Sequence, residues 1–278
     1  DMKCAFMEEV QFDEQKYDLS SSAHIELDGL LEPIPLSRVS IVLARDIGTS
    51  VILGYYLALT AHPSRDDILN CHRSIRQEWK PMDLKTPGLE YPPEAGFPSG
   101  LYPESRDICF GEIKLDNALC HIAREVRKSI TSKEFATFNL GVPRAPRSRN
   151  WVEHAFKIAN QSSHRFASTT GSSVLDPKRK SLKNSKKPPL VSLRTLEECL
   201  DVALASYNAK PQGHLGGNSP LDLVRFQLRT AFLPVHSNFH HENLMNTQQS
   251  DNVTVRWDKW GKTTPHVNFF KVKYKGAA

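Results

Sequence analysis

The sequence has few cysteines, and they form no recognisable pattern. Its 278 residues contain no CxxC pair, and the five cysteines are scattered at Cys4, Cys71, Cys109, Cys120 and Cys199. An odd, unpatterned set predicts reduced cytosolic thiols and argues against a disulfide framework or a zinc ribbon. His240 and His241 have no cysteines at zinc-finger spacing, so we interpret them as polar loop residues.

Long hydrophobic runs are also lacking. No apolar stretch approaches the roughly 18 residues that a membrane span requires, and no signal peptide is visible. The sequence also shows no internal repeat and no helix-turn-helix pattern. We therefore expect no membrane segment, and the structured-looking start at Asp1 predicts a fragment of a longer protein.

The composition itself is that of an ordinary globular protein with a basic lean. Hydrophobic residues make up 39% and charged residues 24%, and the formal net charge is +5. The length suffices for one large domain or two modest ones, each with a substantial core. The charge is compatible with a polyanionic partner without establishing one.

Periodicity and turn signals predict a mixed α/β arrangement in the first half of the chain. Predicted strands cover residues 23–31, 37–48, 50–60 and 134–140, with another ending at Asp116. Predicted helices begin at the N-cap Ser64 and at residues 118 and 151. The second and third strands are joined through Gly48 and Thr49, a hairpin-type connection.

The second half reads as a linker, two helices and a strand module. Helices are predicted over 192–208 and 219–229, and strands over 252–257 and 266–274. The predicted domains are a core over 1–166 with a Pro/Gly-rich insertion at 80–106, a basic linker over 167–191, a helical extension over 192–231 and a small β-barrel over 232–278.

Three acidic residues stand in contexts that favour metal binding. Asp28 ends an extended apolar run (AHIELDGLL), and Asp116 ends another (ICFGEIKLDNA). Glu153 lies 37 positions after Asp116, in the first turn of a helix-like stretch (NWVEHAFKIANQ). Carboxylates at strand ends and on a later helix can converge and hold a pair of hard divalent cations.

Any single acid is more simply explained as a turn or surface residue. Other acids near the predicted strands are therefore compared with these three as possible metal ligands. Asp46 ends a strand that leads into a hairpin, and we assign it a structural role. Asp107 precedes its strand and therefore lies at the wrong end. Glu26 and Glu112 rank lower because they lie inside strands.

The order of these motifs resembles the DDE transposase and retroviral integrase superfamily. The resemblance runs through IELDGLL, IVLARDIGTSVILGYYL, EIKLDNA, a Pro/Arg loop and WVEHAF, followed by YNAKPQGHLGGNSPLDL, and covers about residues 20–275. The long first interval and the C-terminal strands look most like the TnsB and phage Mu transposases. One departure is Ala118, where the family often has glycine after the asparagine.

This resemblance implies a fold and a function. It implies a ribonuclease-H-like mixed sheet flanked by helices, followed by a small C-terminal all-β barrel. Asp28, Asp116 and Glu153 would hold two Mg²⁺ or Mn²⁺ ions, cleave transposon ends and join the 3′-hydroxyl to target DNA. The implied partners are DNA, further copies of the chain and accessory transposition proteins, in the bacterial cytoplasm at the nucleoid.

Basic residues around the acids are candidates for DNA contacts. They are Arg144, Arg147, Arg149, Lys157, Lys178, Arg179, Lys180, Lys183, Lys186 and Lys187. Each has a simpler explanation as a solvated loop or linker charge, and Lys157 as the partner of Glu153 in a helical i,i+4 pair. A basic and aromatic cluster around Trp257 and Trp260 is better explained by packing of the barrel.

Two other functions remain open from the sequence. One is a ribonuclease-H-like nuclease that only hydrolyses its substrate, which would not need the C-terminal strands. The other is a catalytically silent DNA-binding or assembly subunit, which would have no chemical need for three acids.

Overall fold

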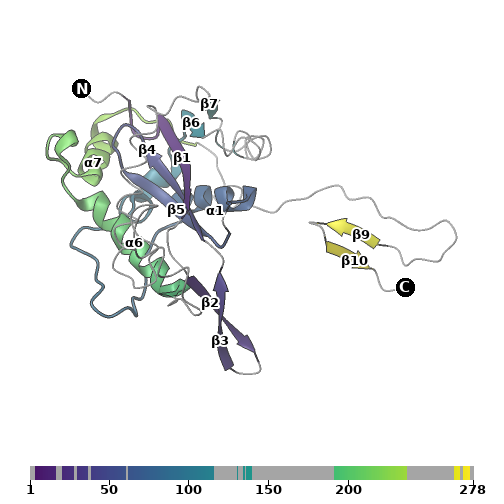
Figure 1. The fold of residues 1–278 in the computed structure, drawn as a ribbon. Coiled ribbons are helices and arrows are strands. Elements are labelled where there is room, and N and C mark those ends of the chain that lie inside the picture. Colours follow the sequence, from purple (N-terminus) through teal and green to yellow (C-terminus); the bar gives the residue numbers. More distant parts are fainter. Residues whose placement is uncertain are drawn as a thin grey trace, which may run out of the picture. The chain divides into compact units, whose positions relative to one another are not determined.

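The computed structural model describes residues 4–16, 21–27, 30–36, 39–60, 62–115, 130, 134, 136–139, 191–236, 266–269 and 272–275. Contacts divide the chain into two compact units, Asp1–Met245 and Asn246–Ala278 (Figure 1). Within the described ranges, no helix is long and apolar enough to cross a membrane.

A mixed five-stranded sheet forms the centre of the first unit. Its strand order is β5-β4-β1-β6-β7, made by β1 (Glu9–Lys16), β4 (Ser40–Asp46), β5 (Ile52–Ala58), β6 (Glu112–Leu115) and β7 (Thr137–Asn139). β1 pairs with β4 and β4 with β5 in antiparallel fashion. β1 pairs with β6 and β6 with β7 in parallel fashion. The prediction of a mixed sheet flanked by helices is confirmed.

The central strand, β1, was not predicted from the sequence. Val10 and Phe12 alternate with polar residues and are fully buried, so the strand has one apolar and one polar face. The other predicted strands of this sheet are confirmed with shorter bounds. Gly48 and Thr49 do lie in the connection between the antiparallel strands β4 and β5.

Helices cover both faces of the sheet. On one face, α1 (Arg65–Arg76) begins at Ser64, whose side chain forms a capping box with Asp67. α1 approaches β5 so closely that a Cβ on Gly54 would lie 2.3 Å from Ser74 Oγ. α7 (Pro220–Thr230) has Ser219 as its N-cap, in agreement with the helix predicted over 219–229, and packs into the same core.

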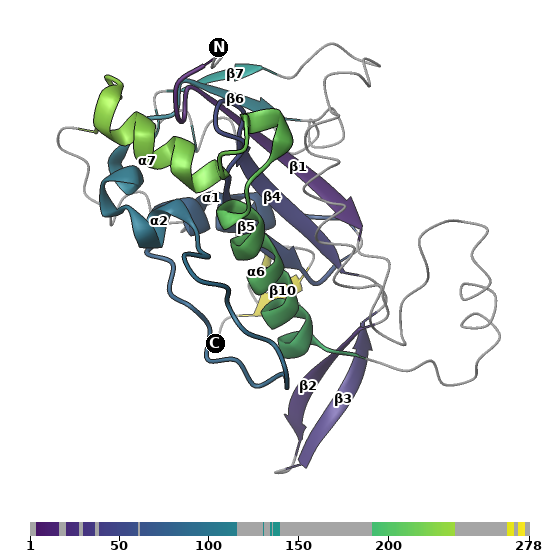
Figure 2. The same ribbon diagram turned by 90° about the vertical axis from the view of Figure 1, so that its left-hand side faces the viewer.

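The opposite face is covered by α6 (Leu193–Ala209), which begins at Ser192. Leu196, Leu200 and Leu204 on this helix belong to one buried cluster with Ile41 and Leu43 of β4. Figure 2 shows α6 lying against the sheet. Asn208 is buried at the C-terminal end of α6. Its side chain accepts the Ile52 N–H at 2.8 Å and donates to the carbonyl oxygens of Ile52 and Gly96.

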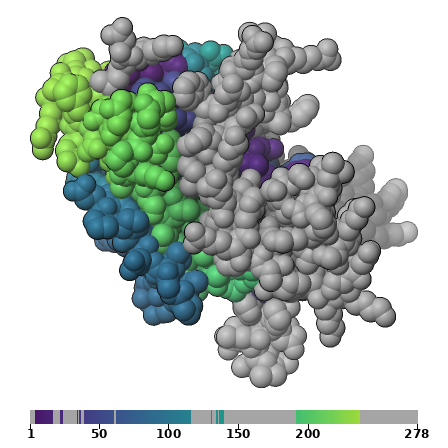
Figure 3. Space-filling model, turned by 60° about the vertical axis from the view of Figure 1, so that its left-hand side comes forward, coloured from purple at the N-terminus to yellow at the C-terminus, as the bar shows by residue number. Residues whose placement is uncertain are grey.

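The insertion predicted at 80–106 is mostly irregular, and acids on α6 hold it in place. It contains the short helix α2 (Pro98–Leu101) and a 3-10 turn, η1 (Pro103–Asp107). Glu198 of α6 accepts the backbone N–H groups of Lys85 and Thr86, at 3.1 and 2.8 Å. The insertion and α6 therefore form neighbouring parts of one face of the molecule (Figure 3).

A second sheet corrects the prediction of a single strand over 23–31. β2 (Ser21–Leu27) and β3 (Leu30–Leu36) pair as an antiparallel hairpin, with Leu27 opposite Leu30. β2 also pairs in parallel with the two-residue strand β8 (Val191–Ser192). This three-stranded sheet, β3-β2-β8, is separate from the central sheet.

Residues 234–236, called the strap below, pair with residues 107–109 in the first unit. The Cys109 N–H donates to the Pro234 carbonyl at 2.8 Å, and the His236 N–H donates to the Asp107 carbonyl at 2.9 Å. Ile108 and Val235 form an antiparallel bridge between these hydrogen bonds. The strap thus pairs with the segment that leads into β6.

In the second unit the structure describes one hairpin, β9 (His266–Phe269) and β10 (Val272–Lys275). Phe269 lies opposite Val272, so the single strand predicted over 266–274 is in fact two paired strands. The remainder of the predicted barrel, the linker over 167–190, and nearly all of the predicted helices at 118–130 and 151–166 lie outside the described residues.

Candidate active site

Most of the residues predicted to form the site lie outside the described ranges. This holds for the three acids Asp28, Asp116 and Glu153 and for every predicted DNA-contacting residue, which are Arg144, Arg147, Arg149, Lys157, Lys178, Arg179, Lys180, Lys183, Lys186 and Lys187. Their roles therefore stay predictions. The strands that precede two of the acids are described, and they bear on how the acids are placed.

Asp28 and Asp116 follow strands that belong to different sheets. β6 ends at Leu115, immediately before Asp116, in the central sheet. β2 ends at Leu27, immediately before Asp28, in the separate three-stranded sheet. The argument that both acids follow adjacent strands of one sheet therefore does not hold for this pair.

Asp13, on β1, is the acid that lies beside the end of β6. β1 and β6 are parallel neighbours, and their register pairs Gln11 with Lys114 and Phe12 with Leu115. Asp13 follows Phe12 on β1, and Asp116 follows Leu115 in the sequence. Neighbouring strands lie about 4.8 Å apart, so this register makes Asp13 a candidate to share an ion with Asp116. Val10 and Phe12 alternate with polar residues just before Asp13, and this pattern is the sequence feature that could have identified the strand carrying Asp13.

The face of β1 and β6 that carries Asp13 is polar. Phe12 points into the apolar core, so its neighbours Gln11 and Asp13 point to the other face. Asp13 is partly buried, and its Oδ1 accepts the Glu14 backbone N–H at 2.8 Å. Lys114 lies on this face by register, and its Nζ contacts Glu9.

Two acids form ion pairs with the ammonium group of Lys114. Its Nζ lies 3.6 Å from Glu112 Oε2 in addition to its contact with Glu9. Partial burial works to lower the pKa of Lys114, but the hydrogen bond and charge of Glu9, with the charge of Glu112, outweigh burial and raise it. The charge of Lys114 is therefore met by these two neighbouring acids.

The chemistry of this donor set fits a hard divalent cation. Carboxylate oxygens are the ligands that Mg²⁺ prefers, and Asp13 follows Phe12, which pairs with the last residue of β6. Within the described ranges, no group of three or more His, Cys, Asp or Glu side chains is spaced to hold a metal ion. Ligands beyond Asp13 would have to come from residues outside those ranges.

A second charged cluster is buried and structural. Glu134 is fully buried, and its carboxylate lies 2.5 Å from both His72 Nε2 and Arg76 Nη2 and 3.3 Å from His236 Nε2. Burial opposes its charge, yet Arg76 and the two histidines hold the pKa of Glu134 far below its usual range. The carboxylate is fully engaged by these three donors, so we assign the cluster to stability and not to chemistry.

Arg76 connects this cluster to neighbouring segments of the chain. Its guanidinium donates to the carbonyl oxygens of Arg106 and Ile108, each at 2.8 Å, and lies 4.2 Å from the ring centre of Phe110. The single side chain therefore ties α1 to the segment before β6, and through Glu134 to the segment before β7. All of these contacts are buried or nearly so.

Asp46, predicted to be structural, is fully buried at the end of β4. Its carboxylate accepts the Met7 N–H at 2.8 Å, and the Thr49 N–H and hydroxyl at 2.7 and 2.6 Å. Burial raises the pKa of Asp46 to about 6, and the donors from Thr49 and Met7 only partly oppose this. The residue fixes the β4–β5 turn and the N-terminal segment together.

Asp46 should make stability depend on pH in the mildly acidic range. Because its pKa is raised by folding, its stabilising contribution is complete below the ordinary value of 3.8 and is lost as the pH rises through about 6. Relative to Asp46→Asn, the wild-type chain should lose about 3 kcal/mol of unfolding free energy between pH 3.5 and pH 7. Urea unfolding of both proteins across this range measures the difference, and a constant difference would refute the assignment.

Comparison with known proteins gives only distant structural likenesses. No family model matches the chain, and no curated protein matches it. The catalytic core domain of BIV integrase aligns with a TM-score of 0.42 and 13% sequence identity, over 81% of this chain and 97% of that one. A simian T-cell lymphotropic virus intasome in complex with PP2A regulatory subunit B56 gamma aligns with a TM-score of 0.42 and 10% identity, over 94% of this chain and 68% of that one. At this similarity neither carries an argument about activity.

Proposed function

We propose that the protein is an integrase-like transposase that cuts and joins DNA strands by metal-dependent phosphoryl transfer. The observation that supports this most is the position of Asp13 on the central strand, beside the parallel strand that ends just before Asp116. Together with the predicted helix that carries Glu153, this pairing gives an acidic set suited to two Mg²⁺ ions. The similarity to TnsB and phage Mu transposases is part of the same proposal.

In this proposal Asp13 takes the place of Asp28 as the first metal ligand. Asp13 and Asp116 hold the ions from neighbouring strands, and Glu153 completes the set. The bound ions supply an activated water or 3′-hydroxyl and stabilise charge on the leaving oxygen.

A branched DNA substrate tests the function without knowledge of any end sequence. Joining of one strand to another is chemically reversible, so a labelled branched oligonucleotide that mimics a joined product is a substrate for the reverse step. The full chain is incubated with this DNA and Mg²⁺ or Mn²⁺. We expect a longer, resealed strand, which appears in denaturing gels only if transesterification occurs.

The other outcomes identify the competing functions. Shortened strands without resealing indicate a nuclease that only hydrolyses. DNA binding with no product, unchanged by Asp116→Asn, indicates a silent assembly subunit. For a transposase, neither resealed nor shortened strands should form when EDTA removes the ions or when Asp116 is replaced by asparagine. DNA binding should be retained in both cases.

A further inference from the structure

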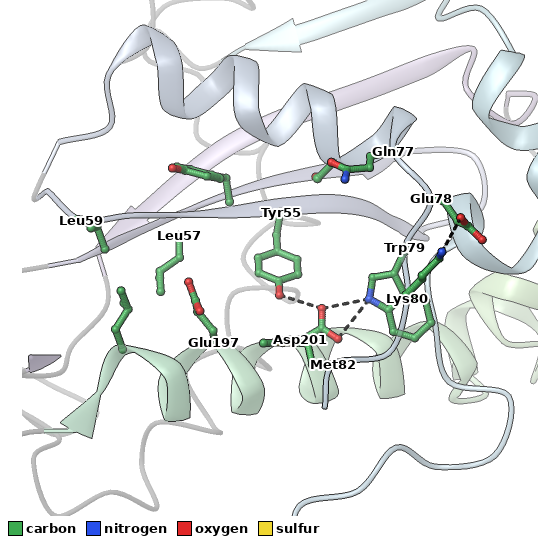
Figure 4. Close-up of a pocket in the computed structure, with 13 residues that line it drawn as sticks. Tyr55, Leu57, Leu59, Gln77, Glu78, Trp79, Lys80, Met82, Glu197 and Asp201 are labelled. Carbon is green, nitrogen blue, oxygen red and sulfur yellow. Dashed lines mark hydrogen bonds and ion pairs between the residues drawn. The ribbon is translucent and has the colours of Figure 1, made fainter. Parts of the chain in front are cut away.

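A groove that the proposed function does not use opens beside β5. It encloses about 380 Å³ and lies between β5, the C-terminal end of α1 and α6 (Figure 4). Leu57 and Leu59 from β5 and the residue after it, together with Leu193 from α6, give it apolar walls. The groove is therefore large enough for one long side chain and the backbone that carries it.

The groove runs along the free edge of the sheet. β5 is the last strand in the sheet order, and across the described ranges no other strand pairs with its outer side. Both Tyr56 and Leu57 line the groove, and adjacent strand residues point to opposite faces. The groove thus follows the edge of β5 and does not sit on one face, which is the position that an added strand would occupy.

One face of α6 supplies two acids to the groove, and among the residues that the structure describes only one of the two accepts hydrogen bonds from side chains. Leu193, Glu197 and Asp201 follow at intervals of four residues. Asp201 accepts hydrogen bonds from the hydroxyl groups of Tyr55 and Tyr91, at 2.8 and 2.6 Å, and from the Trp79 indole. Its acceptor capacity is therefore met by the protein itself.

Glu197 is the acid that is left for a ligand. It is partly buried, and burial raises the pKa of its carboxyl although the charge of Arg194 opposes this. Arg194 directs its own donors elsewhere, to Glu198 at 2.9 Å and to the Asp83 carbonyl at 3.0 Å. Burial deprives the charged carboxylate of Glu197 of hydration, and a cation in the groove would stabilise that charge instead.

We propose that this groove docks an extended segment of a partner protein that carries lysine or arginine between apolar residues. The segment adds as a strand to the edge of β5, and a basic side chain reaches Glu197. Its aliphatic stem packs on Leu57, Leu59 and Leu193. Backbone hydrogen bonds supply general affinity, and the acid selects a basic residue at one position.

Charge argues for a protein segment and against nucleic acid in this groove. Glu78, Glu197 and Asp201 line it, and the one lysine there, Lys80, is paired with Glu78 at 3.2 Å. A DNA phosphate would meet an acidic wall, whereas a basic peptide meets complementary charge. The proposed docking site therefore suits a different kind of ligand from the proposed active site.

Binding of a defined peptide to the full chain tests the proposal. The probe is a fluorescein-labelled heptapeptide in which lysine alternates with valine, compared with the same peptide carrying glutamate for lysine. Fluorescence anisotropy should give a Kd of about 10–100 µM for the basic peptide and no saturation for the acidic one. Hydrogen exchange should show slower exchange in residues 55–59 when the basic peptide is bound.

Single substitutions locate the site. Glu197→Gln should weaken binding about five- to tenfold, and Leu59→Lys should abolish it by placing a like charge in the groove. Glu104→Gln, which changes the same charge at an exposed position on η1, should leave the Kd unchanged. Equal binding of both peptides, an unaltered Kd in Glu197→Gln, unchanged exchange in β5, or no binding up to about 1 mM would each overturn the proposal.

Discussion

Replacing Asp13 by asparagine should abolish strand joining and leave the fold intact. Asp13 lies beside the end of β6, and in the proposed function its carboxylate shares metal ions with Asp116. Asparagine keeps the size of the side chain but removes the charge that holds the ion. We expect a loss of joining on the order of 10²–10³-fold or more, which is typical when a charge-stabilising group is removed from an active site.

The matched control is Asp28→Asn, which makes the same change at the residue that follows β2 in the sequence. If Asp13 is the ligand, Asp28→Asn should retain joining within about threefold of the unmodified chain. Circular dichroism and urea unfolding establish that both variants are folded. The reverse result, with joining lost in Asp28→Asn and kept in Asp13→Asn, would restore the sequence-based assignment and refute ours.

Loss of the buried Arg76 charge should have the largest effect on stability. Arg76→Met keeps much of the side-chain volume but leaves the fully buried Glu134 carboxylate without its main partner, and frees the carbonyl groups of Arg106 and Ile108. Breaking a buried ion pair in this way costs about 3–5 kcal/mol of unfolding free energy. Urea unfolding at pH 7, followed by tryptophan fluorescence, measures the loss.

Two further variants separate the charge effect from the loss of packing. Arg76→Met combined with Glu134→Leu removes the orphaned charge, so it should recover a large part of the lost stability. Arg229→Met makes the same chemical change at an exposed position on α7 and should alter stability by less than about 0.5 kcal/mol. A double variant as unstable as Arg76→Met alone would show that packing, and not the unpaired charge, dominates.

Helix positions were the most predictable part of this fold. Ser64, Ser192 and Ser219 each precede an apolar-periodic stretch, and the structure places all three as N-caps that accept a backbone N–H. Local hydrogen bonding and helical periodicity decide such positions within a few residues of the chain. They could therefore be identified without knowledge of the rest of the molecule.

Strand partners were less predictable, because pairing depends on residues far away in the sequence. β1 has only Val10 and Phe12 as apolar anchors, and it becomes central only through pairing with β4 and β6. An Asp-Gly pair between leucines is a strong signal for a two-residue hairpin connection, and the single strand predicted over 23–31 overlooks it. The prediction of Asp28 as the first metal ligand depends on that single strand, whereas the proposed function assigns this role to Asp13.

The strap at residues 234–236 sets an order of events during biosynthesis. The strap pairs with residues 107–109, and His236 reaches the Glu134 carboxylate in the centre of the unit. The ribosome synthesises the chain from its N-terminus, so α1 and the central strands emerge long before the strap. The strap then completes the charged cluster around Glu134. Until then Glu134 lacks one of its three partners, and the nascent unit is held by its remaining contacts alone. Slow synthesis between residues 139 and 234 would therefore prolong the period in which an incomplete core is exposed to aggregation.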